Sequence, residues 1–384
     1  MLRLLTGNIL DRRNFVKTLK LREISELKTG PFGTQFSAKE YVSEGIPVIN
    51  VKNIGYGNII SEGLDYVGNS TLERLSEHKL KTGDIVFGRK GSVDRHCLIT
   101  KEQDGWMQGS DCIRVRLTDA SVYSNFISYY LLTDAVKTKI NNSAVGSTMA
   151  SLNTDILGDV DINLPCYEEQ YKIASVLSTI DQKIEKNKEI NDYLEQQALL
   201  IFSHMFQNIS YGLNYVGDYI TPKRGKALLS KDAIPGCVPV IAGGLVPATY
   251  HNMANTVAPV LTISGSGANA GYVNIWHDPV WSSDSSYIDY KMTPNVYFWY
   301  AFLKLRQQDI FDIQTGSAQP HIYPKHIAEL SIGDIDNFKV ESYTSQVTPL
   351  FAKIGANVRE NKELQQLRDW LLPMLMNGQA TIED

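Results

Sequence analysis

The chain contains an internal sequence repeat, and each copy leads into a long segment with helical periodicity. The first copy begins at Gly146 and the second at Gly316, an offset of 316 − 146 = 170 residues. Asn-Lys-Glu recurs inside both helical segments, at 187–189 and 361–363, an offset of 361 − 187 = 174 residues. Because self-similarity at a fixed offset marks a repeated structural unit, the chain is predicted to contain two similar units.

The composition fits two or three globular units with their own cores. The chain has 384 residues, of which 43% are hydrophobic. It has no run of eighteen apolar residues and no apolar leader, so we expect neither a membrane span nor a signal peptide, and a cytoplasmic location. Cys97, Cys112, Cys166 and Cys237 form no CxxC pair, so buried reduced thiols are expected rather than a zinc site or disulfides.

The charge pattern restricts where nucleic acid could bind. The net charge of −5 argues against a uniformly basic binding face. Basic residues nevertheless gather locally, at Arg89-Lys90 with Arg95 and at Lys223-Arg224 with Lys226. Any nucleic-acid site is therefore expected in loops.

The two larger blocks both have an α+β pattern. Apolar runs at 46–51 and 83–87 and a period-two alternation at 112–117 predict strands in the first block, followed by a helix over 123–140. Runs at 238–241 and 259–263 and a helix around 297–305 repeat the plan. Pro47 and Pro239 align at an offset of 192, so the second block has shorter loops. The predicted domains are 1–165, a spacer helix 166–207, 208–340, and a second spacer helix with the tail, 341–384.

The two spacer helices are predicted to pair with each other. The first should begin after Pro165 and run to about Phe206, and the second can begin at Pro349. Aliphatic residues follow each helix at spacings of three and four, with Asn187 or Asn361 in the middle of the stripe. A narrow stripe with a polar layer is typical of a coiled coil, here antiparallel. The alternative is two independent surface helices, each packed on its own domain.

The length of such a pair suggests what it could separate. A helix from Glu168 to Phe206 would span about 58 Å at 1.5 Å per residue. Duplex DNA rises about 3.4 Å per base pair, so two globular blocks on this spacer could read two halves of one split site. A spacer of this size is hard to explain in a small-molecule enzyme.

At this point the chain resembles a known family. The tract from Gly146 through Ile162, with Leu164-Pro165, Glu168-Glu169-Gln170 and Ile180-Asp181, is similar to the specificity subunit of type I restriction–modification systems, as is Trp370 through Gly378. Gly83 through Ser92 and Thr262 through Val273 resemble the target-recognition domains of that family. The resemblance covers about Leu21 to Gly378, and its motifs are specific through their order and duplication.

The resemblance implies a function without catalysis. Family members read a bipartite double-stranded DNA site with two target-recognition domains and bind two methyltransferase subunits, which use S-adenosylmethionine to methylate adenine. Restriction subunits join them and cleave DNA with ATP, so the chain itself needs no cofactor. Two features depart from the family: the tract before Leu21 does not align, and Ser342-Tyr343-Thr344 replaces Glu-Glu-Gln, so the second helix could begin later and the two ends could hold partners unequally.

Two alternatives remain open. An enzyme with a fused recognition module would need a cofactor motif, but the sequence has neither a P-loop nor any Pro-Pro dipeptide, so the adenine methyltransferase motif is absent. A protein-only coiled-coil adaptor would show no salt-dependent DNA affinity. His96, His321 and His326 are expected in structural or surface roles, and no metal site is predicted.

The candidate DNA contacts are polar and basic residues of loops, since these side chains bond phosphates and base edges. We expect Asn187 and Asn361 to fix helix register. Gly146-Ser147-Thr148 and Gly316-Ser317 are expected to shape loops that lead into the helices, and Gly265-Ser266-Gly267 is either a close approach to DNA or a plain hairpin turn. The candidate DNA-binding residues are Lys28, Thr29, Thr34, Gln35, Lys52, Asn53, Arg89, Lys90, Ser92, Lys223, Arg224, Lys226, Ser264, Ser266 and Asn269.

Overall fold

The computed structural model divides the chain into two compact units. It describes residues 2–4, 17–144, 150–316 and 319–382, so Gly146-Ser147-Thr148 and Ser317 lie outside the described residues. One unit comprises Met1–Gln182 with Leu364–Asp384, and the other comprises Lys183–Glu363. Among the described helices, none combines the length and apolar content needed to cross a membrane.

The first unit is built on two sheets with helices α2 (Asn69–Arg74), α3 (Ser124–Leu131), α4 (Asp134–Ser143) and α5 (Thr154–Gly158). The larger sheet has the order β3 (Ser25–Thr29), β11 (Cys112–Leu117), β8 (Ile85–Gly88), β9 (His96–Leu98) and β6 (Tyr56–Gly57). The smaller has the order β10 (Met107–Gln108), β5 (Ile46–Ile49), β7 (Asp65–Val67) and β4 (Tyr41–Val42). Ile85, Val86 and Phe87 are fully buried, as their apolar run predicts.

The second unit repeats this plan. Its larger sheet has the order β14 (Lys223–Arg224), β20 (Ser285–Asp289), β17 (Val260–Ser264) and β18 (Val273–Trp276). Its smaller sheet has the order β16 (Thr249–His251), β15 (Val238–Ile241) and β19 (Trp281–Ser282). β15 pairs parallel with β19 just as β5 pairs parallel with β10. Helices α8 (Val296–Leu305), α9 (Gln307–Asp312) and α10 (Pro324–Ala328) complete the unit, which confirms the predicted duplication of an α+β plan.

The repeated unit begins before Leu21, the residue at which the family resemblance begins. β2 (Lys17–Lys20) pairs with β12 (Asp161–Leu164) ahead of α1 (Leu21–Ile24), and β13 (Asn214–Tyr215) pairs with β21 (Ser331–Ile332) ahead of α7 (Val216–Tyr219). Residues 17–20 therefore belong to the repeated unit. The terminal strands β1 (Leu2–Leu4) and β22 (Ala380–Ile382) also pair, antiparallel.

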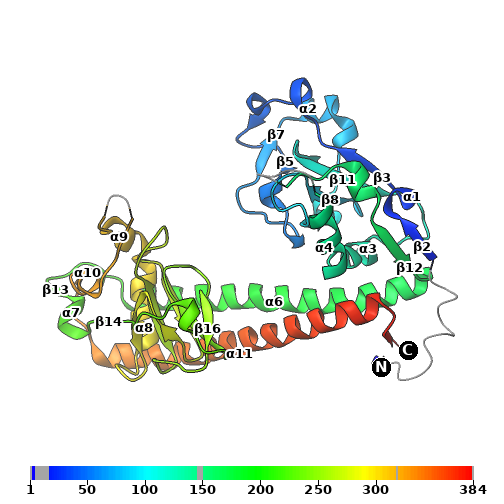
Figure 1. The fold of residues 1–384 in the computed structure, drawn as a ribbon. Helices are drawn as coiled ribbons and strands as arrows, with labels where there is room; N and C mark the ends of the chain where they lie inside the picture. The colour runs from blue at the N-terminus through cyan, green and yellow to red at the C-terminus, as the bar shows by residue number, and fades with distance from the viewer. Residues whose placement is uncertain (1, 5–16, 145–149, 317–318, 383–384) are drawn as a thin grey trace. The chain divides into compact units, whose positions relative to one another are not determined.

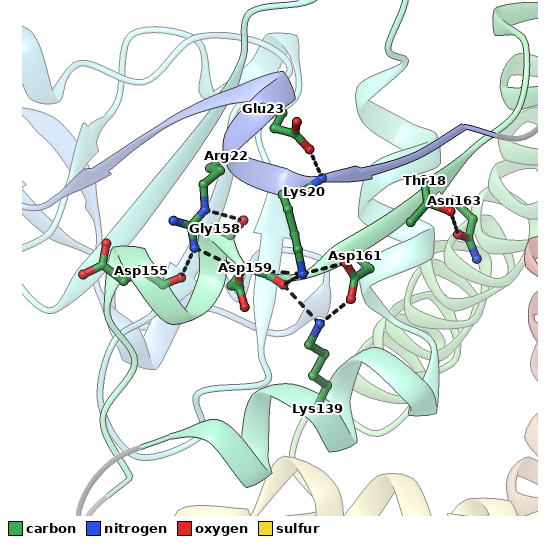
Figure 2. A network of polar contacts seen from close by, with 10 residues as sticks. All are labelled: Thr18, Lys20, Arg22, Glu23, Lys139, Asp155, Gly158, Asp159, Asp161 and Asn163. Atoms are coloured by element: carbon green, nitrogen blue, oxygen red, sulfur yellow. Dashed lines mark hydrogen bonds and ion pairs between the residues drawn. The ribbon is translucent and has the colours of Figure 1, made fainter.

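A charged network holds the start of the first unit in place (Figure 2). Asp161 pairs with Lys20 and with Lys139 of α4, each at 2.6 Å, and these two ammonium groups lower the pKa of the Asp161 carboxyl to about 2. Arg22 pairs with Asp159 at 3.1 Å. The strand before α1 is thereby joined to the segment that leads into the long helix α6 (Tyr167–Met205).

The long helices α6 and α11 (Asn337–Met376) pack together, as their stripes predict (Figure 1). In the second unit, partners run in opposite directions: Asn187 meets Asn361, Asn191 meets Asn357, and the hydroxyl of Tyr343 donates to the carbonyl of Ala198. The pair is therefore antiparallel, with asparagine layers facing each other. In the first unit, Asp181 of α6 accepts from Arg368 of α11 at 2.9 Å and from the Tyr129 hydroxyl of α3 at 2.6 Å.

Several predicted details are wrong. The helix expected over 123–140 is two helices, because Thr133 adopts an extended conformation (φ −64°, ψ 142°) and starts α4 with Asp134 in its first turn. Helix α11 begins at Asn337, not at Pro349, because the Asp336 carboxylate accepts from the amides of Phe338 and Lys339 and caps it.

Two burial patterns also differ from the expectation. The first four residues of β11 are all buried, so its alternation does not mark a solvent face. Among the cysteines, Cys97 and Cys112 are buried, and burial raises the pKa of the Cys97 thiol to about 12. Cys166 and Cys237, expected to be buried, are exposed because they lie in connecting segments outside the cores.

Candidate nucleic-acid interface

In the first unit, the loop after β8 lies against the segment that precedes α5. The Gly91 amide donates to the Ala150 carbonyl at 3.0 Å, and the Leu152 amide donates to the Arg89 carbonyl at 2.8 Å. Lys90 and Ser151 form an antiparallel bridge. These bonds fix the backbone from which Arg89, Lys90 and Ser92 project.

The second unit contains the same frame. The Gly267 amide donates to the Pro320 carbonyl at 3.0 Å, and the Ile322 amide donates to the Gly265 carbonyl at 3.0 Å. Ser266 and His321 form the bridge that corresponds to Lys90 and Ser151. The Leu152 and Ile322 positions stand at the offset of 322 − 152 = 170 found in the sequence. The loops after β8 and β17 are therefore equivalent.

The ends of β3 and β14 are equivalent as well. The Gly30 amide donates to the Cys112 carbonyl at 2.9 Å, and the Gly225 amide donates to the Ser285 carbonyl at 2.8 Å. Lys28-Thr29 in one unit therefore corresponds to Lys223-Arg224 in the other. In both units most of the predicted DNA-binding residues come from the same two sites of the sheet. The basic ones lie at both sites in the first unit and at the strand end in the second.

In each unit the structure brings most of the candidates to one end of the larger sheet. The Arg89 guanidinium lies 5.9 Å from the ring centroid of exposed Phe32, which immediately precedes Gly33, Thr34 and Gln35. The first loop cluster consists of Lys28, Thr29, Thr34, Gln35, Lys52, Arg89, Lys90 and Ser92. The second loop cluster consists of Lys223, Arg224, Lys226, Ser266 and Asn269.

Two candidates do not belong to these clusters. Asn53 is fully buried; its amide nitrogen donates to the carbonyls of Ile60 and Glu62, and its oxygen accepts from the amide of Asn50. Ser264 is 4% exposed within β17. Because both side chains are buried, neither can reach a duplex without local unfolding, so we correct the candidate list at these two positions.

Carboxylates hold several of the basic side chains. Lys90 pairs with Asp111 at 3.1 Å, Lys52 pairs with Asp65 at 2.8 Å, and Lys28 pairs with Glu77. In the second unit Asp284 pairs with Arg224 and accepts from the Ser266 hydroxyl. Since the amides of Arg89 and Gly265 donate to the carbonyls of Asp111 and Asp284, these aspartates occupy equivalent positions.

Sequence reasoning missed these acidic and aromatic members. A search for basic and amide residues in loops passes over Asp111, Asp284 and Phe32. It also passes over Tyr323, whose ring centroid lies 5.8 Å from the guanidinium of Arg224. A signal was available for Phe32, because a large apolar residue inside Gly-Pro-Phe-Gly is typical of an exposed loop rather than a core strand.

The predicted register residues form a buried polar layer within the second unit. The Asn187 Nδ2 atom donates to Asn361 Oδ1 and to the Glu360 carboxylate, each at 2.8 Å. Asn361 donates back to the carbonyl of Ile184 at 3.1 Å. Asn187 is 1% and Asn361 is 8% exposed, so another register would leave buried amides without partners.

The histidines show no arrangement suited to a metal. Within the ranges that the structure describes, no three His, Cys, Asp or Glu side chains gather as a possible metal site. His96 is fully buried, its Nε2 atom lies 3.0 Å from the Ser128 hydroxyl, and burial lowers its pKa to about 4.

The repeated frame and the paired helices define a class of protein: a duplicated subunit that presents two corresponding polar loop clusters. Residues 15–196 match the family model described as the type I restriction modification DNA specificity domain. Residues 15–196 therefore carry a DNA specificity domain of the kind found in type I restriction–modification systems.

Individual relatives support this assignment along the chain. The chain is 25% identical to the specificity subunit of the type I restriction enzyme MjaIX from Methanocaldococcus jannaschii, over 95% of this chain and 93% of the relative. It is 23% identical to the MjaVIII specificity subunit of the same organism, over 51% and 49% of the two chains. The crystal structure of the S subunit of a type I system from M. genitalium has a TM-score of 0.60 at 20% identity, covers 97% and 99% of the chains, and supports the fold.

Proposed function

We propose that this chain is a specificity subunit of a type I restriction–modification system. It would read a bipartite double-stranded DNA site, one half with each loop cluster. The observation that carries the proposal is the repeated backbone frame, which presents basic and hydroxyl side chains at the same end of both larger sheets. Lys and Arg suit phosphates and guanine edges, whereas Gln and Asn suit adenine. The side chains of the two clusters differ, so the half-sites should differ in sequence.

The proposal assigns catalysis to partner subunits. Two methyltransferase subunits would supply S-adenosylmethionine chemistry, and restriction subunits would supply ATP-dependent cleavage, with this chain placing them on DNA in the cytoplasm. The partners would dock on the exposed faces of α6 and α11 and the neighbouring domain surfaces. We place the first recognition domain at 1–165 and the second at 208–340, with the spacer helices at 166–207 and 341–384. The asparagine layer would set the gap between half-sites.

A salt titration of DNA binding tests the proposal against a protein-only adaptor. We expect the chain, in complex with its methyltransferase subunit, to lose DNA affinity steeply with salt, because cations that contact phosphate displace counterions. Lys90→Ala should weaken binding and reduce the salt slope by about 1 if Lys90 contacts phosphate.

Lys101→Ala is the matched control. Lys101 is exposed and follows β9 at the opposite end of the same sheet, so its loss should leave both affinity and slope unchanged. Affinity that did not depend on salt, or an equal effect of both substitutions, would favour the adaptor.

A further inference from the structure

The guanidinium of Arg224 is held on two sides within the second unit. It forms an ion pair with Asp284 through Nη2, and it lies 5.8 Å from the ring centroid of Tyr323, just ahead of α10. The second carboxylate oxygen of Asp284 accepts from the Ser266 hydroxyl, which orients the carboxylate. The side chain of Arg224 nevertheless remains 39% exposed, and Tyr323 is 44% exposed. The arginine is thus oriented and still accessible.

Gly265 creates the space for this arrangement. A Cβ atom at this position would collide with the Nη1 atom of Arg224 and would lie 2.8 Å from Asp284 Oδ1. Any other residue would displace the guanidinium. The backbone frame equates Gly265 with Arg89 of the first unit, whose guanidinium lies by the ring of Phe32.

The corresponding site of the first unit carries a different set of side chains. Thr29 stands at the position of Arg224, and Lys90 at the position of Ser266. There the shared aspartate, Asp111, pairs with Lys90 at 3.1 Å. The two units keep the carboxylate but take the cation from different elements, a strand end in one and a hairpin loop in the other.

We propose that Arg224 reads a guanine in the second half-site, with Asp284 and Tyr323 as positioning residues. This inference rests on the proposed DNA-reading function. An arginine bonds guanine O6 and N7 through two parallel N–H groups, so it needs a fixed plane, which a ring face and a carboxylate supply. A phosphate can also be bound by a point charge such as the ammonium group of neighbouring Lys223, so a phosphate contact does not require this fixed plane. The first half-site receives no arginine from the equivalent strand end.

Selection of bound duplexes from a randomised pool tests this inference. The probe is the chain in complex with its methyltransferase subunit, as wild type and as Arg224→Lys, which keeps the charge but loses the fork. We expect a guanine at one position of the wild-type second half. Arg224→Lys should reduce the preference for it by about 10-fold or more, as expected for one bidentate contact. The first half should not change.

Two substitutions at Tyr323 distinguish a loss of Arg224 positioning from a loss of folding. Tyr323→Leu should weaken the same guanine preference, whereas Tyr323→Phe keeps a ring face and should retain it. Lys291→Ala, an exposed lysine beyond the opposite end of β20, is the control and should leave the selected sequence unchanged. If Arg224→Lys does not assemble, the Tyr323 pair decides the test.

Two results would overturn the inference while leaving the proposed function intact. One is a split wild-type motif without guanine in its second half. The other is an unchanged motif in Arg224→Lys, with affinity reduced equally for all sequences. If the wild-type complex selected no split motif, the proposed function itself would fail together with the inference.

Discussion

The aspartates at the two equivalent positions show how one frame can present different contacts. Asp111 orients a lysine from a hairpin loop, and Asp284 orients an arginine from a strand end and a serine hydroxyl. Exposed ion pairs of this kind add little stability, about 0–1 kcal/mol, because water screens them. Their value here is orientation, since a long cationic side chain held in one geometry can make a directed contact.

Buried His96 predicts a pH dependence of stability. Its folded-state pKa of about 4 lies below the unfolded value near 6.5, so the unfolded chain binds the proton first as the pH falls. Its contribution is fully present above pH 6.5 and is lost progressively as the pH falls to 4. The loss should reach about 3 kcal/mol, from about 2.5 pKa units at 1.36 kcal/mol each.

Urea unfolding at several pH values measures this slope. His96→Gln should flatten the decline between pH 6.5 and 4, although it lowers stability at neutral pH because the buried Ser128 hydroxyl must find a new partner. The same substitution at exposed His204, at the end of α6, should keep the decline. An unchanged slope in His96→Gln would show that another group controls the acid sensitivity.

At the scale of elements, the asparagine layer gives up stability for a defined register. The Asn187–Asn361 bond is buried in the helix seam beside Ile184, where two leucines would pack at least as well. A polar pair inside an apolar seam is satisfied in one register only. The layer therefore favours one alignment of α6 and α11 over its neighbours.

Replacing both asparagines by leucine tests the register role. Asn187→Leu with Asn361→Leu should preserve folding and raise the melting temperature or leave it unchanged. Either single substitution should cost about 1–3 kcal/mol, because the remaining buried amide loses the bond to its partner. The double variant should also methylate sites with more than one gap between the halves. One unchanged gap in its methylation pattern would contradict the register role.

The elements themselves were largely predictable from the sequence. Apolar runs identified β5, β8, β15 and β17, and the three-and-four stripe with its asparagines identified the α6–α11 pair. The start of α11 was missed because a proline at 349 suggests a first turn, whereas the effective cap is Asp336, thirteen residues earlier. Helix breaks depend on one or two residues, and tertiary packing often overrides such weak signals.

The candidate site was only partly predictable. Loop position and residue type selected Arg89, Lys90 and Arg224 as candidates. Asn53 was selected on the same grounds, but it is buried, and its side-chain amide donates to the carbonyl of Ile60. The carboxylates and rings that orient the cations could not be predicted, because they come from segments far away in the sequence. Pairing of Arg224 with Asp284 spans 60 residues, and it depends on the sheet that brings β14 and β20 together.

At the scale of the whole molecule, the duplication is the central fact. Each compact unit contains its own larger sheet, its own loop cluster and part of both long helices. The unit boundary lies inside α6 and α11, so each helix belongs in part to both units. A chain of this design has two sites of the same plan but different side chains, which is what an asymmetric split DNA site requires.

Mapping methylated adenines in a genome tests this account most directly. The chain would be expressed with its methyltransferase subunit in a host that otherwise lacks adenine methylation. We predict a single motif with two short, different defined halves separated by one fixed gap, and no methylation when either subunit is expressed alone. A continuous unsplit motif would contradict two-site reading, and methylation by this chain alone would contradict the assignment of catalysis to the partner.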